Sequence, residues 1–495
     1  MIPIRLNAIR AAFLAFAVPV TGGMFSDEGS TGLGWSGSFL TDMRVRLEEP
    51  WEFQRREFRL SLHSEAGFGR KGRFFADTRL RHLGFASPRT AADLTEAGEV
   101  LPAEVLLREA YFDVYGLFFE GLDMRVGRQL VPWGSAYLIN PTATINAHDL
   151  EDMFTFGERL GADGIKLSWY AGPATLEALA VPFFRPAVLP ADVWDGLARD
   201  QVSLPEEMGS LVTVASMEDT LELPRTTPAE GALGGVRAST LLMGFDWSLS
   251  YVYGRDDFPA PRHVRVGFVD SAVSTETLIQ VMTTGSPLPV RTHTAMVFPR
   301  RHNVGLDCAG ALGDLGVWAE AAVFFPEEVV TTARLETPIE GLSAAARALL
   351  PEDITALLEG ERVAVDTVLE DTPYWKLATG GDYTWKNGFY LNAQYVHGFM
   401  YERGENLSDF IVAETRWDLL GDMLSITPLG LGLGVSDFED IESSYTLLYQ
   451  PEITWKPFDN LDVTVGVRMV DAGSESTFSA LRERDHGYFR GEYVF

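Results

Sequence analysis

Arginine recurs at alternate positions in several short segments near the two ends of the chain. The set comprises Arg44, Arg46, Arg59, Arg79, Arg81, Arg468 and Arg490. A guanidinium group offers paired N–H donors that match a carboxylate or a phosphate, so a basic wall of this kind is suited to attracting anions. The wall is unexpected in a 495-residue chain with 70 Asp and Glu against 40 Lys and Arg, a formal net charge of −30. A simpler interpretation is that these arginines pair with Asp42, Asp77 and Glu492 and only satisfy a polar interior.

A second polar cluster lies in the segment from about Gln129 to Arg159. It consists of His148, Asp149, Glu151 and Asp152. If this segment folds inward as a constriction loop, its carboxylates oppose the arginines and set a transverse field that orients dipolar solutes. The alternative is a loop that packs on the outer rim and leaves the interior open.

Several kinds of chemistry are missing from the sequence. The single cysteine, Cys308, excludes a disulfide framework, a thiolate zinc site and a covalent c-type haem. No Gly-x-Ser-x-Gly elbow, His-Glu-x-x-His helix or Gly-x-x-x-x-Gly-Lys loop occurs. His148 and His486 each have an Asp beside them, which leaves a rim protease or lipase as a minor alternative. We therefore predict no enzyme, no cofactor and no metal, and the acidic charge argues against nucleic acid as a partner.

The elements that position these residues show period-2 alternation in pieces of about ten residues. Between residues 461 and 470 (LDVTVGVRMV), apolar side chains share one face and polar side chains the other. The predicted strands are 36–47, 57–66, 73–83, 107–115, 122–129, 161–170, 175–181, 234–241, 245–254, 300–310, 315–325, 374–385, 389–399, 410–419, 424–435, 445–456, 461–470 and 486–495. This gives eighteen strands, with sixteen as the alternative if 107–115 and 234–241 are not strands.

Three features indicate that these strands form an all-β transmembrane antiparallel barrel. Tight turns such as Lys386–Gly388 alternate with connections of roughly 30 to 50 residues, the asymmetry of outer-membrane barrels. Tryptophans recur near strand ends, as in an interfacial girdle, at Trp169, Trp247, Trp375, Trp385, Trp417 and Trp455. The last strand ends at Phe495, similar to the terminal signal for barrel insertion. We predict that the chain lies in the outer membrane of a Gram-negative bacterium.

The N-terminus has the pattern of a secretory signal peptide. Residues 1–23 contain Arg5 and Arg10, a short apolar run and small residues for cleavage. The rest, residues 24–495, is predicted to be one barrel with no soluble second domain. Its long outer loops, 182–233 and 326–373, are richer in Leu, Val and Ala than solvated loops usually are, and 342–358 is helix-like. Such loops either form a lid over the barrel or gather an apolar ligand or a protein partner.

One stretch resembles a known family. Residues 127–134 (GRQLVPWG), followed by 139–142 (INPT), look like a motif of a large, poorly characterised proteobacterial family of porin-like outer-membrane proteins. Similar pieces recur at 182–186 and 315–321. The resemblance implies an outer-membrane pore and names no substrate.

The sequence thus favours a porin-like channel for passive transport of small solutes, with amphipathic or hydrophobic acids among them. Its partners would be outer-membrane lipid, lipopolysaccharide and the solute, with either a homotrimer or a complex with a protein partner as the assembly. The competing interpretation is a barrel that sheaths or anchors a partner protein, such as a cytochrome conduit or a surface assembly.

Overall fold

The computed structural model describes most of the chain after the N-terminal region. The described residues are 33–86, 88, 90–95, 97–155, 157–190, 212–269, 283–284, 286–336, 344–349, 352, 355–356, 364–476, 478–482 and 484–495. The predicted signal peptide, residues 1–23, lies outside them, as do residues 191–211 of the predicted outer loop 182–233.

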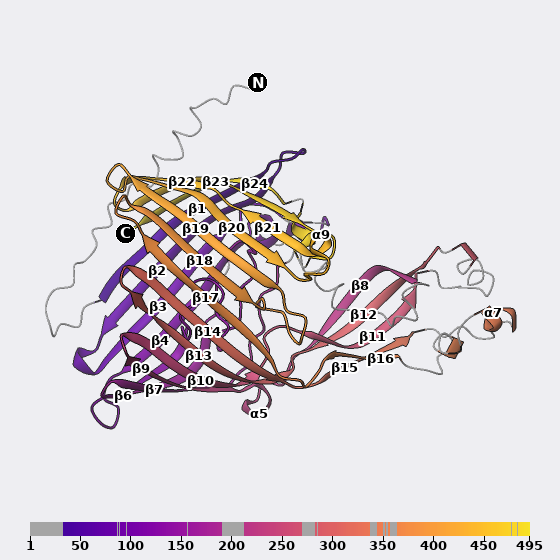
Figure 1. The fold of residues 1–495 in the computed structure, drawn as a ribbon, viewed down its shortest axis with the longest axis horizontal. Helices are drawn as coiled ribbons and strands as arrows, with labels where there is room; N and C mark the ends of the chain where they lie inside the picture. The colour runs from indigo at the N-terminus through magenta and orange to yellow at the C-terminus, as the bar shows by residue number, and fades with distance from the viewer. Residues whose placement is uncertain are drawn as a thin grey trace, which may run out of the picture.

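Nineteen antiparallel strands close into a barrel, in which β1 pairs with both β2 and β24. The barrel strands are β1 (Leu33–Arg46), β2 (Phe53–Gly67), β3 (Gly72–His82), β4 (Ala103–Val114), β5 (Leu122–Gln129), β6 (Ala162–Ala171), β7 (Ala174–Val181), β9 (Leu233–Leu242), β10 (Phe245–Arg255), β13 (Arg300–Leu312), β14 (Leu315–Pro326), β17 (Tyr374–Thr384), β18 (Phe389–His397), β19 (Asp409–Leu419), β20 (Leu424–Val435), β21 (Tyr445–Tyr449), β22 (Glu452–Phe458), β23 (Leu461–Ala472) and β24 (His486–Val494). Figure 1 shows them tilted around a common axis.

β21 and β22 occupy one position, because both lie between β20 and β23. The interruption falls at Gln450 and Pro451, and proline has no backbone N–H to donate to a ladder. The barrel therefore has eighteen strand positions, each of which overlaps one predicted strand. The predicted count of eighteen is confirmed and the alternative of sixteen is wrong, since 107–115 and 234–241 lie in β4 and β9.

A second sheet projects from the end of the barrel that carries the long loops (Figure 1). Its strands, in the order β16, β15, β11, β12 and β8, are β16 (Ala364–Leu369), β15 (Val329–Leu335), β11 (Ala260–Phe268), β12 (Leu288–Val297) and β8 (Val212–Glu222). Two of its four pairings, β11 with β15 and β12 with β8, are parallel and join different loops.

This sheet corrects the prediction for the outer loops. The lid was one of two alternatives for these loops, but the described parts of 182–233 and 326–373 contribute strands to a sheet that extends away from the barrel. The short helices are α2 (Ala97–Val100), α5 (Pro228–Gly231), α7 (Ala344–Leu349) and α9 (Ile441–Ser444), with 3-10 turns η1 (Gly69–Lys71), η2 (Asp93–Thr95) and η3 (Ser479–Leu481). Of these, α7 lies within the segment predicted to be helical. The Leu, Val and Ala content of the loops reflects strands as well as helices.

The outer face of the barrel is apolar and is bordered by tryptophan. All six tryptophans named from the sequence are between 39% and 54% exposed. Five lie near the short turns, and Trp375 lies at the long-loop end. Exposed Leu306, Phe325 and Ile411 belong to the same outer face. An apolar band with aromatic borders is stable in a bilayer, so the strands span a membrane.

No helix in the described part of the chain has the length and apolar character needed to cross a membrane.

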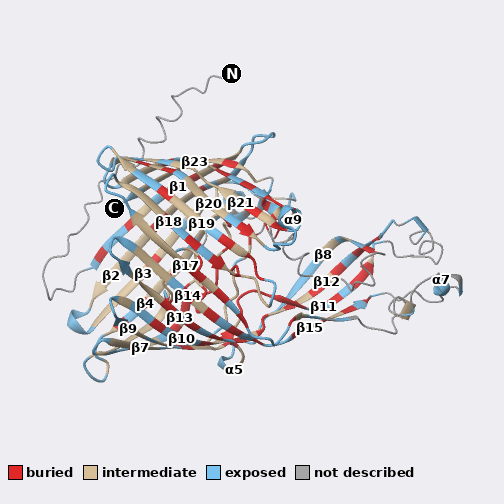
Figure 2. Ribbon diagram, viewed as in Figure 1, coloured by how far each residue is buried: buried red, intermediate tan, exposed pale blue. Residues whose placement is uncertain are grey.

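The hydrophobic core lies inside the barrel. One cluster of buried side chains includes Val131, Trp133, Ile145, Val181 and Val252. Another, named here the lumen cluster, includes Ile139, Leu150, Met153, Phe399, Phe410, Val470, Phe478 and Leu481. Figure 2 shows that buried positions gather in the half of the barrel nearer the projecting sheet. Both clusters contain residues of the segment between β5 and β6, so this segment fills part of the lumen.

Candidate site in the barrel lumen

The segment that joins β5 to β6 runs through the lumen and is here called the internal loop (residues 130–161). It begins after Gln129, which is fully buried, and ends before Ala162. One side chain links its two ends: Asn146 Oδ1 accepts the N–H of Val131 at 2.7 Å, and Asn146 Nδ2 donates to the carbonyl of Leu160 at 2.9 Å. The loop therefore has a closed base formed by its own residues.

The first half of the internal loop docks on β14 through one carboxylate. Glu320 accepts the backbone N–H of Ala136 at 2.6 Å and the hydroxyl of Thr142 at 3.0 Å. It also accepts the backbone N–H groups of Ser135 and Thr142. Gly134 adopts φ +106°, and a Cβ there would lie 2.6 Å from the same carboxylate, so only glycine fits. The two segments of the family-like motif, 127–142 and 315–321, thus meet at this contact.

Further contacts hold the first half of the loop against the neighbouring wall. Trp133 is 2% exposed and donates its indole N–H to Glu177 at 2.9 Å. The N–H of Tyr137 donates to Gln394 Oε1 at 2.9 Å, and Trp318 Nε1 donates to the same oxygen. Through these bonds the motif residues help to fix the path of the internal loop.

The second half of the loop binds arginines by ion pairs. Asp152 lies 2.5 Å from Arg44 Nη2 on β1, and Glu151 lies 2.6 Å from Arg81 Nη2 on β3. Burial opposes ionisation of Asp152, but Arg44 holds its pKa well below the usual value. The structure therefore brings the predicted acidic residues into direct contact with the basic wall instead of leaving an open gap between them.

His148 of the predicted cluster contacts Asp257 instead of the arginine wall. His148 Nδ1 lies 2.7 Å from Asp257 Oδ2, and the backbone N–H of His148 donates to the same oxygen at 2.8 Å. Burial, followed by the charge of Arg159, lowers the pKa of His148 to about 4, so its ring is neutral at pH 7. Burial also raises the pKa of Asp149.

The seven arginines named from the sequence lie on five adjacent strands, β23, β24, β1, β2 and β3. Most already have carboxylate partners. Arg59 pairs with Glu57 at 2.7 Å, and Arg79 pairs with Glu158 at 3.4 Å. Looser contacts join Arg46 to Glu48 and Arg490 to Asp42, each at 3.8 Å.

Sequence reasoning missed further arginines on these strands and on β4, among them Arg73 of β3, which pairs with Asp113 at 2.9 Å. Arg55 pairs with Glu57 at 2.5 Å and lies 3.8 Å from Glu151, and Arg108 pairs with Glu158 at 3.1 Å. Arg55 keeps the alternation of Glu57 and Arg59, which was the available signal, whereas Arg108 lies at a register shift between β3 and β4 that alternation does not predict.

Arg468 differs from the other arginines. It is 2% exposed, and its Nε donates to Gln450 at 2.8 Å. Its guanidinium lies over the rings of Phe154 and Tyr488, at 5.2 Å and 4.7 Å from their centres. Within the described residues it has no carboxylate in ion-pair contact, and its Nη1 has no hydrogen-bond partner.

A cavity of about 340 Å³ lies beside Arg468, between the internal loop and β19–β24. The lumen cluster supplies much of its lining. Its volume falls in the range of small-molecule pockets. Sequence reasoning missed it, although residues 429–434 (LGLGLG) carried a signal: leucines alternate with Gly430, Gly432 and Gly434, and all three glycines line the cavity.

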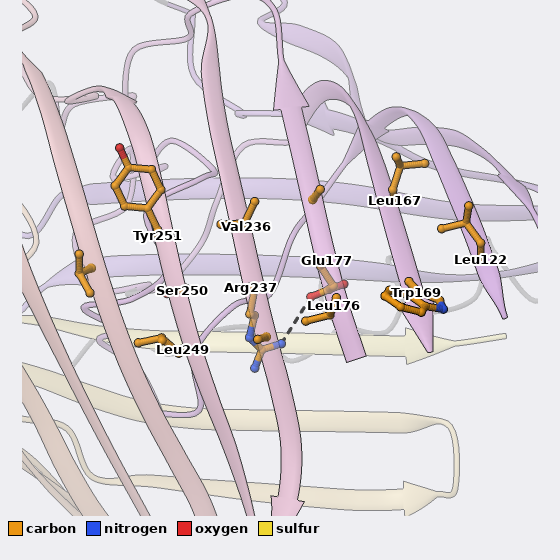
Figure 3. Close-up of a pocket in the computed structure, with 13 residues that line it drawn as sticks. Leu122, Leu167, Trp169, Leu176, Glu177, Val236, Arg237, Leu249, Ser250 and Tyr251 are labelled. Carbon is orange, nitrogen blue, oxygen red and sulfur yellow. Dashed lines mark ion pairs between the residues drawn. The ribbon is translucent and has the colours of Figure 1, made fainter. Parts of the chain in front are cut away.

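A different hollow, about 510 Å³, lies on the outer face and is unrelated to the lumen (Figure 3). Leu167, Trp169, Leu176 and Leu249 line it from the lipid side. The Glu177–Arg237 ion pair drawn there, at 3.6 Å, belongs to alternate positions that face the interior. In a bilayer this hollow meets acyl chains.

The fold and the lumen define the chain as a closed transmembrane barrel of eighteen strand positions with an internal loop. No family model matches it, and no curated protein matches its sequence. Solved structures match at low identity. OccK11 (OpdR) of Pseudomonas aeruginosa has 8% identity and a TM-score of 0.46 over 95% of this chain and 99% of its own. OmpF of Salmonella typhi, in complex with daunomycin, has 10% identity and a TM-score of 0.38 over 95% and 99%.

Proposed function

We propose that the protein is a porin-like channel of the Gram-negative outer membrane that passes small solutes passively and favours anions. The observation that carries this proposal is the strip of arginines on five adjacent strands, with the internal loop docked on it by ion pairs. A basic wall attracts anions into the lumen, and the loop limits their size. Parts of the lumen are apolar. An acid with an apolar part would contact both these parts and the arginines, which supports amphipathic or hydrophobic acids as the preferred solutes.

The resemblance of residues 127–142 to a porin-like family fits this proposal, because these residues fix the course of the internal loop. We propose membership of that family on this basis. Lipid and lipopolysaccharide would surround the barrel, and a homotrimer would be the assembly.

The test is single-channel current through the purified barrel in a planar bilayer, with the reversal potential measured in a KCl gradient. We expect steady current steps with anion preference. Deleting residues 145–157 should enlarge the steps, and Arg59→Gln should reduce the anion preference. A folded barrel that conducts no ions, or whose deletion variant keeps the same conductance and selectivity, would overturn the proposal.

The projecting sheet favours a second candidate function, a barrel that anchors or sheaths a partner protein at the cell surface. The discriminating measurement is the mass of the native protein after mild detergent extraction. A single chain or a homotrimer supports the channel. A stable complex with another protein, lost when residues 260–297 are deleted, supports the anchor.

A further inference from the structure

The 340 Å³ cavity has one polar end and one apolar end. β19 and β20 place Glu414 and Gly430 toward the short turns, and Phe410 and Gly434 toward the long loops. Arg468 and Arg490 line the cavity at the polar end, and Phe410, Phe478 and Leu481 line it at the apolar end. The cavity is therefore amphipathic along the barrel axis.

The polar end holds a buried cation with an unused donor. Arg468 is 2% exposed, and its Nη1 has no partner within the described residues. The bonds it does make are to a neutral amide and to two aromatic faces, and the carboxylate that attracts it, Asp152, is already paired with Arg44. A buried cation is stable only when an anion or strong acceptors are close, so an anionic ligand would complete this site.

The middle of the cavity is open because glycine stands at position 432. A Cβ at Gly432 would meet only the side chain of Leu448, at 3.5 Å, whereas at Gly434 the ring of Phe410 covers the backbone. Phe478 packs edge-to-face against Phe399 and Phe410, which are tilted against each other, with ring centres 5.2 Å to 6.1 Å apart, and the three rings form an aromatic wall. Such a wall suits an alkyl or aryl tail.

We propose that this cavity binds an amphipathic monocarboxylate, with the carboxylate on Arg468 and Arg490 and the apolar tail among Phe410, Phe478 and Leu481. The other charged group of the lining is Glu414, which would repel a second carboxylate. The proposal rests on the channel function above and names the substrate class for its lumen.

The test measures binding of labelled octanoate to the barrel in lipid nanodiscs by equilibrium dialysis. Empty nanodiscs of the same lipid correct for partition into the bilayer. We expect saturable binding that acetate, which lacks the tail, and 1-octanol, which lacks the charge, displace at least roughly tenfold less well than unlabelled octanoate.

Two variants test the polar end and the middle of the cavity independently. Arg468→Gln should weaken octanoate binding by roughly tenfold or more, because a charged hydrogen bond is lost. Gly432→Leu should abolish binding by filling the middle of the cavity. Arg59→Gln is the matched control, because Arg59 is a wall arginine outside the cavity lining, and it should leave binding unchanged. Folding of each variant is checked by heat-modifiable mobility in gel electrophoresis.

The outcomes separate this proposal from the channel proposal. Saturable octanoate binding without ion current keeps the site and overturns the channel. Ion current with octanoate binding that is absent, or equal in the wild type, Gly432→Leu and Arg468→Gln, keeps the channel and overturns the site. Equal loss of binding in Arg59→Gln would show a general charge effect and would also overturn the site.

Discussion

The two halves of the internal loop are held in different ways. Residues 130–147 are fixed by backbone and amide hydrogen bonds and by Glu320, which accepts four donors. Residues 148–160 are held by ion pairs to Arg44 and Arg81 and by the His148–Asp257 contact. Hydrogen bonds from neutral donors respond less to salt than ion pairs do. The attachment of the second half to the barrel wall therefore depends more on salt than that of the first half.

The largest effect should come from breaking the first half. Glu320→Ala leaves three backbone N–H groups and one hydroxyl without their acceptor, which costs on the order of 5 kcal/mol of loop docking. We expect a large rise in conductance and proteolysis of the loop in folded barrels. Glu320→Gln keeps one acceptor oxygen, so its conductance and loop proteolysis should lie between those of the wild type and of Glu320→Ala. An unchanged loop in Glu320→Ala would remove the distinction between the halves.

Arg44→Gln should loosen only the second half. It removes the closest partner of both Asp152 and Asp42 and leaves Asp42 only the 3.8 Å contact with Arg490, a loss of about 4 kcal/mol. The double variant Arg44→Gln with Asp152→Asn should recover part of this loss, because one unpaired charge is gone. The measurement is a double-mutant cycle on thermal unfolding, and additivity of the two variants would contradict the pairing.

Acid should act on the second half through His148. Its folded pKa of about 4 lies below the unfolded value of 6.5, so its stabilising contribution is complete above pH 6.5 and is lost as the pH falls toward 4. The loss is about 3 kcal/mol between pH 7 and pH 4. The measurement is the frequency of current fluctuations against pH. These should increase on acidification in the wild type and vary much less with pH in His148→Gln.

Salt should give the smallest effect. The pairs of Glu158 with Arg79 and Arg108 are partly exposed, so screening in 1 M salt weakens them by about 0.5 to 1 kcal/mol. Protease cleavage near Glu158 should increase slightly with salt, and cleavage near Ala136 should not. Equal salt dependence of cleavage at both places would contradict the difference between the two halves of the loop.

The sequence predicted the barrel because a strand with one lipid face and one lumen face must alternate. It also placed the arginines on adjacent strands, since neighbouring strands are consecutive in this topology. Loop contacts were harder to predict. Glu320 was visible as an inward position of the 315–321 segment, but its partners depend on the path of a loop that begins nearly 200 residues earlier.

The projecting strands were missed for a different reason. β15 and β16 are short, and the second neighbour of β15, which is β11, comes from another loop. A parallel pairing such as β11 with β15 leaves no turn signal in the sequence, because the strands are not joined by a hairpin. The alternation of glycine in β20 was visible in the sequence. That these glycines line a cavity could be predicted only by knowing which face of the strand is buried.

The parallel pairings of the projecting sheet also impose an order of assembly. β8, the β11–β12 pair and the β15–β16 pair come from three separate loops, and their ends meet only where the barrel hairpins stand side by side. Contacts between segments far apart in sequence form slowly until something else brings them together. The sheet is therefore expected to form last, after the barrel has closed, and a chain arrested before closure should lack it while its hairpins are already paired.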